Sequence, residues 1–162
     1  MRTSVFTLLA LTAILSASGA RAEPVIGSIQ ETSFSDGCGC TFYRPSDAAR
    51  KIRTHPVFLN TYGSPPGRDK AVMNLRGRDV EVAPSTIRWF RDTLQPAREV
   101  RLSDTFKTLD GRMTIRLDRT VRDLCRQGPK ECESFVYDAM FHVFDRSGKK
   151  LQILRAKGEC GC

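Results

Sequence analysis

The six cysteines carry the most distinctive chemistry in this sequence. Four of them form two C-G-C motifs far apart in the chain, Cys38-Gly39-Cys40 and Cys160-Gly161-Cys162, and the other two are Cys125 and Cys132. Thiols at these spacings can form structural disulfides, ligate a soft metal ion as thiolates, or act as a redox-active pair. An even number of cysteines favours three disulfides.

Spacing narrows the possible pairings of the two C-G-C motifs. In an extended chain, residues i and i+2 point to the same face, so both cysteines of one motif can face both cysteines of the other. An antiparallel arrangement pairs Cys38 with Cys162 and Cys40 with Cys160, whereas a parallel one pairs Cys38 with Cys160 and Cys40 with Cys162. A third bridge, between Cys125 and Cys132, would pin the base of a short loop.

A metal site is the alternative use of the same sulfurs. Cys38, Cys40, Cys160 and Cys162 could together supply four thiolates to zinc or copper. Structural zinc sites usually space their ligands as C-x₂₋₄-C, so C-x-C fits that chemistry imperfectly. Disulfides are therefore the favoured interpretation, with no resident cofactor, and the metal site stays open beside a redox role.

Catalytic signals are weak. The sequence has no P-loop, GxGxxG, HExxH or GxSxG motif, and its only histidines are His55 and His142, which we expect to be surface or half-buried residues. No catalytic residue can be nominated, so binding is favoured over catalysis.

One aromatic cluster suits partner binding. Arg88, Trp89, Phe90 and Arg91 place the only tryptophan beside a phenylalanine, between two arginines. That composition is typical of a partner hot spot or a membrane-interface contact. The competing interpretation is that one of these rings fills an end of the fold.

The first 22 residues have the features of a secretory signal. A basic start at Arg2 precedes an apolar stretch, and Ala20-Arg21-Ala22 forms an A-x-A cleavage site. We therefore expect an exported protein, periplasmic or extracellular, whose residues 23–162 form a single domain with no transmembrane segment after cleavage.

Charge then points to the class of partner. Without the leader, 24 basic residues face 18 acidic ones, a net charge of +6. A basic exported domain favours an anionic envelope component, lipid or glycan, and the compartment argues against nucleic acid. An inhibitor of host lysozymes is a weaker alternative, because lysozymes of that kind are themselves basic. A purely structural envelope component is another alternative.

Alternating apolar residues predict mostly short strands. Met113–Val121, Phe135–Val143 and Leu151–Ala156 form a three-stranded antiparallel meander, with a turn at Asp145–Gly148. Further strands are expected at 25–34, 40–44, 56–62, 71–75 and 80–83, with a tight turn over 76–79. Ser46 is expected to cap a short helix over 46–53. The fold class is all-β, a small disulfide-stapled antiparallel barrel or sandwich with at most one or two short helices.

Three short motifs carry a resemblance. The stretches GCGCTFY (Gly37–Tyr43), MNLxGxDV (Met73–Val80) and GxCGC (Gly158–Cys162) resemble those of a group of short exported bacterial proteins of unknown function. The resemblance implies export and one domain that includes both C-G-C motifs. It implies no activity, ligand or catalytic residue.

Overall fold

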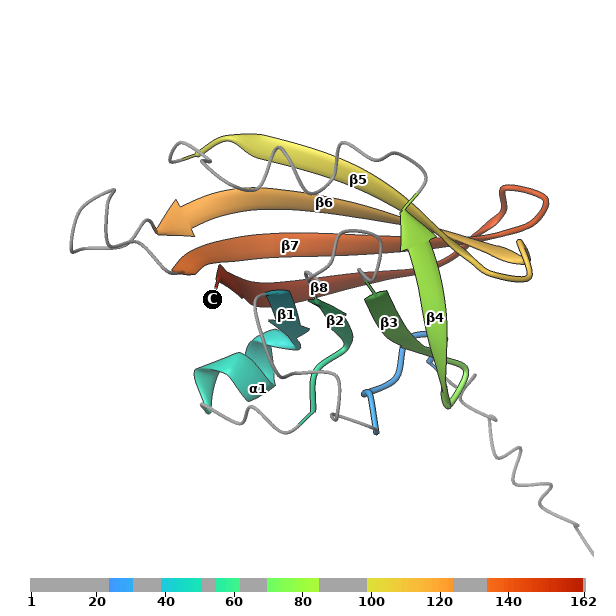
Figure 1. Cartoon of the computed structure of the whole chain (residues 1–162), viewed down its shortest axis with the longest axis horizontal. Helices are drawn as coiled ribbons and strands as arrows, with labels where there is room; N and C mark the ends of the chain where they lie inside the picture. The colour runs from blue at the N-terminus through green and yellow to red at the C-terminus, as the bar shows by residue number, and fades with distance from the viewer. Residues whose placement is uncertain are drawn as a thin grey trace, which may run out of the picture.

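The computed structural model is a closed barrel of eight antiparallel strands in which each strand pairs with the next and β8 pairs with β1. It describes residues 24–30, 39–50, 55–61, 70–84, 99–123 and 134–161. The strands are β1 Gly39–Tyr43, β2 Phe58–Thr61, β3 Lys70–Leu75, β4 Arg78–Pro84, β5 Arg101–Thr108, β6 Met113–Asp123, β7 Ser134–Asp145 and β8 Lys150–Gly161. Figure 1 shows the long strands β5–β8 along one side and the shorter β1–β4 along the other. The prediction of an all-β barrel or sandwich is confirmed as a barrel.

The barrel closes where β1 meets β8. Their antiparallel register places Cys40 opposite Cys160, and a disulfide joins these two residues. This bridge confirms the antiparallel pairing predicted for Cys40, and the parallel alternative is wrong. Cys38, Cys125, Cys132 and Cys162 lie outside the described residues.

The long-range bridge explains how two strands 120 residues apart in sequence stay paired. Cross-linking a loop of that length lowers the entropy of the unfolded chain, which stabilises the fold by roughly 4–5 kcal/mol. The bridge therefore fixes the seam of the barrel.

Within the described residues, tight turns make the β3–β4, β5–β6 and β7–β8 connections. Arg76 and Gly77 both have positive φ, 53° and 75°, the pattern of a two-residue turn that matches the twist of its flanking strands. The predicted hairpin at 71–83 is thus confirmed, with a turn of two residues. Gly111 and Gly148 take positive φ in the β5–β6 and β7–β8 turns, so the predicted C-terminal meander is confirmed as β6–β8.

The interior is filled by aromatic side chains from strands on both sides of the barrel. Phe42 contacts Phe58 and Phe141 edge to face, and Phe58 also packs against Phe106. Each of these rings is fully buried and sits at an inward position of its strand. An eight-stranded barrel is just wide enough to be filled by side chains, so this centre is a packed core.

Three local expectations differ from the structure. Residues 25–30 form a single bridge, Ile26 to Leu75, and not the expected strand; residues 31–34 lie outside the described part. This segment instead packs against β2 and β3, because Ile29 joins Leu59 and Val72 in a small apolar cluster.

The helix begins one residue earlier than expected. α1 spans Pro45–Ala49, and its N-cap is Arg44, with no side-chain capping bond. Pro45 is favourable at the first helical position because its missing N–H would have no partner there, so Ser46 is not the cap. Residues 51–54 of the expected helix lie outside the described residues.

Strand β5 was not expected from the sequence. Its inward positions are Leu102, Asp104, Phe106 and Thr108, so a carboxylate interrupts the apolar alternation. That carboxylate is accommodated by an ion pair inside the barrel, described below.

Candidate functional site: a groove across β5–β8

A groove crosses the outer face of the four long strands. The strand register sets Arg101, Thr120, Asp138 and Lys157 side by side in one row, on β5, β6, β7 and β8. The adjacent row is formed by Ser103, Asp118, Met140 and Arg155. These side chains alternate with the inward core residues, so they share the outer face. The groove has a volume of about 650 Å³, and Pro45 at the start of α1 lines it beside β8.

The acidic groups of the groove already have cationic neighbours. Arg122 Nε lies 2.7 Å from Asp138 Oδ2, and Arg116 Nε lies 3.1 Å from Asp118 Oδ2. All four side chains are between 38% and 55% exposed, so each pair contributes little to stability. Their relevance is to charge balance, because each aspartate is offset by a neighbouring arginine outside the groove lining.

Three basic residues of the groove are left uncompensated. Within the part of the chain that the structure describes, no acidic group lies within ion-pair distance of Arg101, Arg155 or Lys157. All three are exposed. Arg101 lies at the β5 side of the groove, whereas Arg155 and Lys157 lie together on β8. The groove therefore presents a net excess of positive charge at both of its sides.

A serine, an aspartate and a histidine meet beside the groove without forming a catalytic triad. Ser103 Oγ donates a 2.7 Å hydrogen bond to Asp118 Oδ1, and His142 Nε2 lies 3.1 Å from Asp118 Oδ2. In a hydrolytic triad the histidine stands between the other two and takes the proton of the serine. Here the aspartate is central, so His142 is not positioned to activate Ser103.

His142 points outward yet is only 7% exposed, which corrects the expectation of a surface or half-buried residue. Its ring stacks on Phe144 at a centroid distance of 6.5 Å. Burial and the nearby Arg116 charge lower the pKa of His142, and Asp118 offsets part of that effect. His55 is exposed, as expected.

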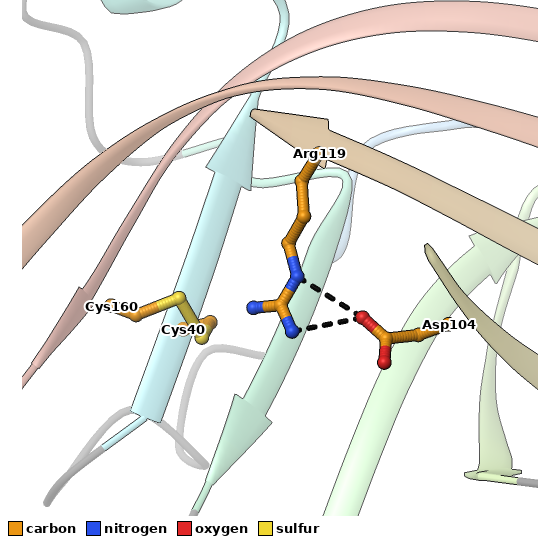
Figure 2. Close-up of a disulfide and its surroundings, with 4 residues drawn as sticks. All are labelled: Cys40, Asp104, Arg119 and Cys160. Carbon is orange, nitrogen blue, oxygen red and sulfur yellow. Dashed lines mark hydrogen bonds and ion pairs between the residues drawn. A yellow bond between two sulfur atoms is a disulfide. The ribbon is translucent and has the colours of Figure 1, made fainter. Parts of the chain in front are cut away.

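An ion pair inside the barrel supports the strands beneath the groove. The Nε and Nη2 atoms of Arg119 lie 3.0 and 2.8 Å from Asp104 Oδ2, and both contacts are drawn in Figure 2 with the Cys40–Cys160 disulfide. The Arg119 side chain is 0% exposed, and its guanidinium lies 5.2 Å from the Tyr137 ring centroid. This pair joins β5 to β6, the two strands that carry Arg101 and Thr120.

A second hollow lies where the tight hairpins meet. It has a volume of about 960 Å³ and is lined by residues of the β3–β4, β5–β6 and β7–β8 turns, among them Arg78, Arg146 and Glu81. Among the described residues, four basic and three acidic side chains line this hollow, a net charge of +1, whereas four basic and two acidic side chains line the groove, a net charge of +2.

Two of those acids are held by their turns. A hydrogen bond from Thr108 is the main cause that lowers the pKa of Asp110, and one from Ser147 does the same for Asp145. Both therefore stay ionised near neutral pH and offset nearby arginines. The described lining of the hairpin end is therefore less positive than that of the groove.

The structure describes only some of the candidate site residues that the sequence indicated. Arg88, Trp89, Phe90 and Arg91 lie outside the described residues. Within the described residues, no group of three or more histidine, cysteine or acidic side chains could hold a metal ion. Cys40 and Cys160, two of the four candidate ligands, are joined in the disulfide.

The groove residues are not neighbours in the sequence, so no local cluster of basic residues marks them. The basic clusters Arg76–Arg78 and Lys149-Lys150 lie instead at the hairpin end. Arg101 and Arg155 are 54 residues apart and meet only through the sheet register. In the sequence, the two-residue spacing of Ile153, Arg155 and Lys157 was the one local sign that Arg155 and Lys157 share a face of β8.

Comparison of the chain with protein-family models, with curated proteins and with solved structures gave no match. In the described part of the chain, no helix is both long enough and apolar enough to cross a membrane.

Proposed function

We propose that this chain is an exported, non-enzymatic binding protein whose β5–β8 groove holds an anionic component of the bacterial envelope. The observation that carries the proposal is the convergence of Arg101, Arg155 and Lys157 on one groove whose aspartates are already paired. Guanidinium groups match carboxylates and phosphates in geometry as well as in charge.

Export is supported by the A-x-A leader and by a long-range disulfide, which persists in oxidising compartments. A zinc or copper site at the C-G-C motifs is the second candidate. It is less favoured because ligation by Cys40 and Cys160 would first require reduction of their disulfide.

The proposal is tested with the protein produced with its own leader and purified from the exported fraction. Binding to immobilised lipopolysaccharide, which carries both acidic sugars and lipid phosphates, is compared with binding to neutral phosphatidylcholine vesicles. We expect binding only to lipopolysaccharide, and we expect it to weaken with salt, because the Debye length falls from about 10 Å at 0.1 M to about 3 Å at 1 M.

Two triple variants separate the groove from total charge. Arg101→Gln/Arg155→Gln/Lys157→Gln empties the groove of uncompensated cations, whereas Arg78→Gln/Arg146→Gln/Lys149→Gln removes the same charge from the hairpin end. All six side chains are exposed, so both variants should fold. We expect at least about a tenfold loss of affinity for the groove variant and a much smaller one for the control. Equal losses would contradict a role for the groove.

A further inference from the structure

The middle of the groove, called its floor below, carries acidic side chains that favour some classes of anionic ligand over others. Asp138 and Asp118 stand in the middle of the groove, between Arg101 on β5 and Lys157 on β8. A carboxylate accepts about four hydrogen bonds. Asp138 contacts Arg122 through a single oxygen, so part of its accepting capacity faces the groove. An occupant should therefore carry hydrogen-bond donors at its centre.

The spacing of the three cations along the sheet indicates where a bound ligand should carry its anionic groups. Arg101 and Lys157 are three strands apart in one row, a separation of roughly 14 Å at the usual strand spacing. Arg155 is two residues from Lys157 on the same face, about 7 Å away. The groove thus pairs a cation at one side with two cations at the other, with carboxylates and the Thr120 hydroxyl between them.

We infer that the occupant is an acidic glycan, a short saccharide chain with anionic groups toward its two ends and free hydroxyls between them. Sugar hydroxyls would donate to Asp138 and bond with Thr120, while the anionic groups would meet Arg101 and the Arg155–Lys157 pair. A polyanion without hydroxyls would instead meet the carboxylates as like charges, which is unfavourable.

A lipid chain fits the groove less well. Among the apolar residues that line the groove, Leu102, Ala139 and Ala156 occupy inward positions. Met140 and Pro45 are the remaining apolar side chains, and they lie on the outer face. That area is too small to cover an acyl chain, although Met140 suits the apolar face of a sugar ring.

This inference rests on the proposed function, and the experiment separates the two. The exported protein is titrated with an oligosaccharide of alginate, which has carboxylates and hydroxyls, and with polyacrylate of matched charge, which has carboxylates and no hydroxyls. Anionic phosphatidylglycerol vesicles and neutral dextran complete the set. We expect alginate to bind about fivefold or more tightly than polyacrylate at equal salt, the factor that roughly one net hydrogen bond supplies.

Two variants test the floor. Thr120→Val removes a hydroxyl from the groove, and Thr114→Val is its control on the same strand and face, outside the groove. Asp138→Asn removes the central negative charge. We expect Thr120→Val to weaken alginate alone, by about twofold to fivefold. We expect Asp138→Asn to strengthen polyacrylate and so reduce the preference.

Each outcome decides a different point. Equal binding of alginate and polyacrylate, with both lost in the Arg101→Gln/Arg155→Gln/Lys157→Gln variant, would overturn the glycan inference and keep the anion groove. Binding to phosphatidylglycerol vesicles without binding to alginate would also overturn it and assign a lipid partner. Failure of every anion to bind would overturn the inference and the proposed function together.

Discussion

At the scale of single residues, a buried ion pair distinguishes this barrel from a purely apolar one. Arg119 reaches Asp104 from the neighbouring strand inside the core, where an unpaired charge is strongly disfavoured. Such pairs contribute little net stability compared with apolar replacements, but removing one partner is costly. The pair is therefore costly to break, although it adds little stability beyond what apolar side chains would supply.

This gives the first prediction. Asp104→Ala should lower the free energy of unfolding by about 3–5 kcal/mol, because it removes the Asp104 carboxylate from the buried Arg119 guanidinium. The double variant Asp104→Leu/Arg119→Met should recover most of that loss. Urea unfolding of both variants measures the difference, and an equally unstable double variant would show that packing, not charge, is responsible.

His142 supplies a prediction of pH dependence. Because burial lowers its pKa in the folded state, the unfolded chain binds a proton at this site more readily than the folded chain. The contribution of His142 to the free energy of unfolding is fully present above the unfolded-state pKa of about 6.5. It is lost as pH falls toward the folded-state pKa, by no more than about 1.4 kcal/mol per pH unit.

The measurement compares wild type with His142→Asn between pH 7.5 and pH 5. The difference in unfolding free energy between the two proteins should narrow as pH falls. A difference that is constant across this range would contradict a lowered pKa for His142.

At the scale of elements, periodicity predicted most strands and failed where polar residues face inward. β6 and β7 alternate apolar and polar residues over most of their length, with Arg119 in β6 as an exception, so they were predicted within a few residues. β5 was missed because Asp104 occupies an inward position, and its partner Arg119 lies in another strand. The groove could not be foreseen for a related reason: its rows depend on register, which alternation within one strand does not define.

The C-G-C motifs show the opposite case, in which spacing alone predicted a long-range contact. Two cysteines at i and i+2 share a face, so spacing predicted that the motifs pair either antiparallel or parallel, and the structure selects the antiparallel pairing of Cys40 with Cys160. The same register leads us to predict Cys38–Cys162 as a second bridge.

The predicted bridges should differ in how much they stabilise the fold. Cys38→Ser/Cys40→Ser releases the loop of more than 100 residues and should cost roughly 4–5 kcal/mol, whereas Cys125→Ser/Cys132→Ser releases only a short loop and should cost roughly 2 kcal/mol. Denaturant midpoints of the two variants, each purified under non-reducing conditions, provide the comparison. Equal shifts of the midpoint would contradict the ranking and point to a different set of pairings.

At the scale of the whole molecule, the register of the four long strands creates the candidate site. The disulfide at the β1–β8 seam and the ion pair between β5 and β6 fix the strands that carry Arg101, Arg155 and Lys157. These cations come from two strands that are not adjacent, so they converge only when the intervening β6 and β7 are in register. The rigid sheet thus holds three cations in place without loss of loop entropy on binding.

Nuclear magnetic resonance titration of the protein with an alginate oligosaccharide tests the proposed anion groove most directly. At low salt, amide shifts should change mainly over segments 101–103, 118–120, 138–140 and 155–157, and they should revert as salt is raised. The hairpin turns at 76–77, 109–112 and 146–149 should change little. Shift changes confined to those turns, or absent from the four groove segments at saturating ligand, would contradict the account.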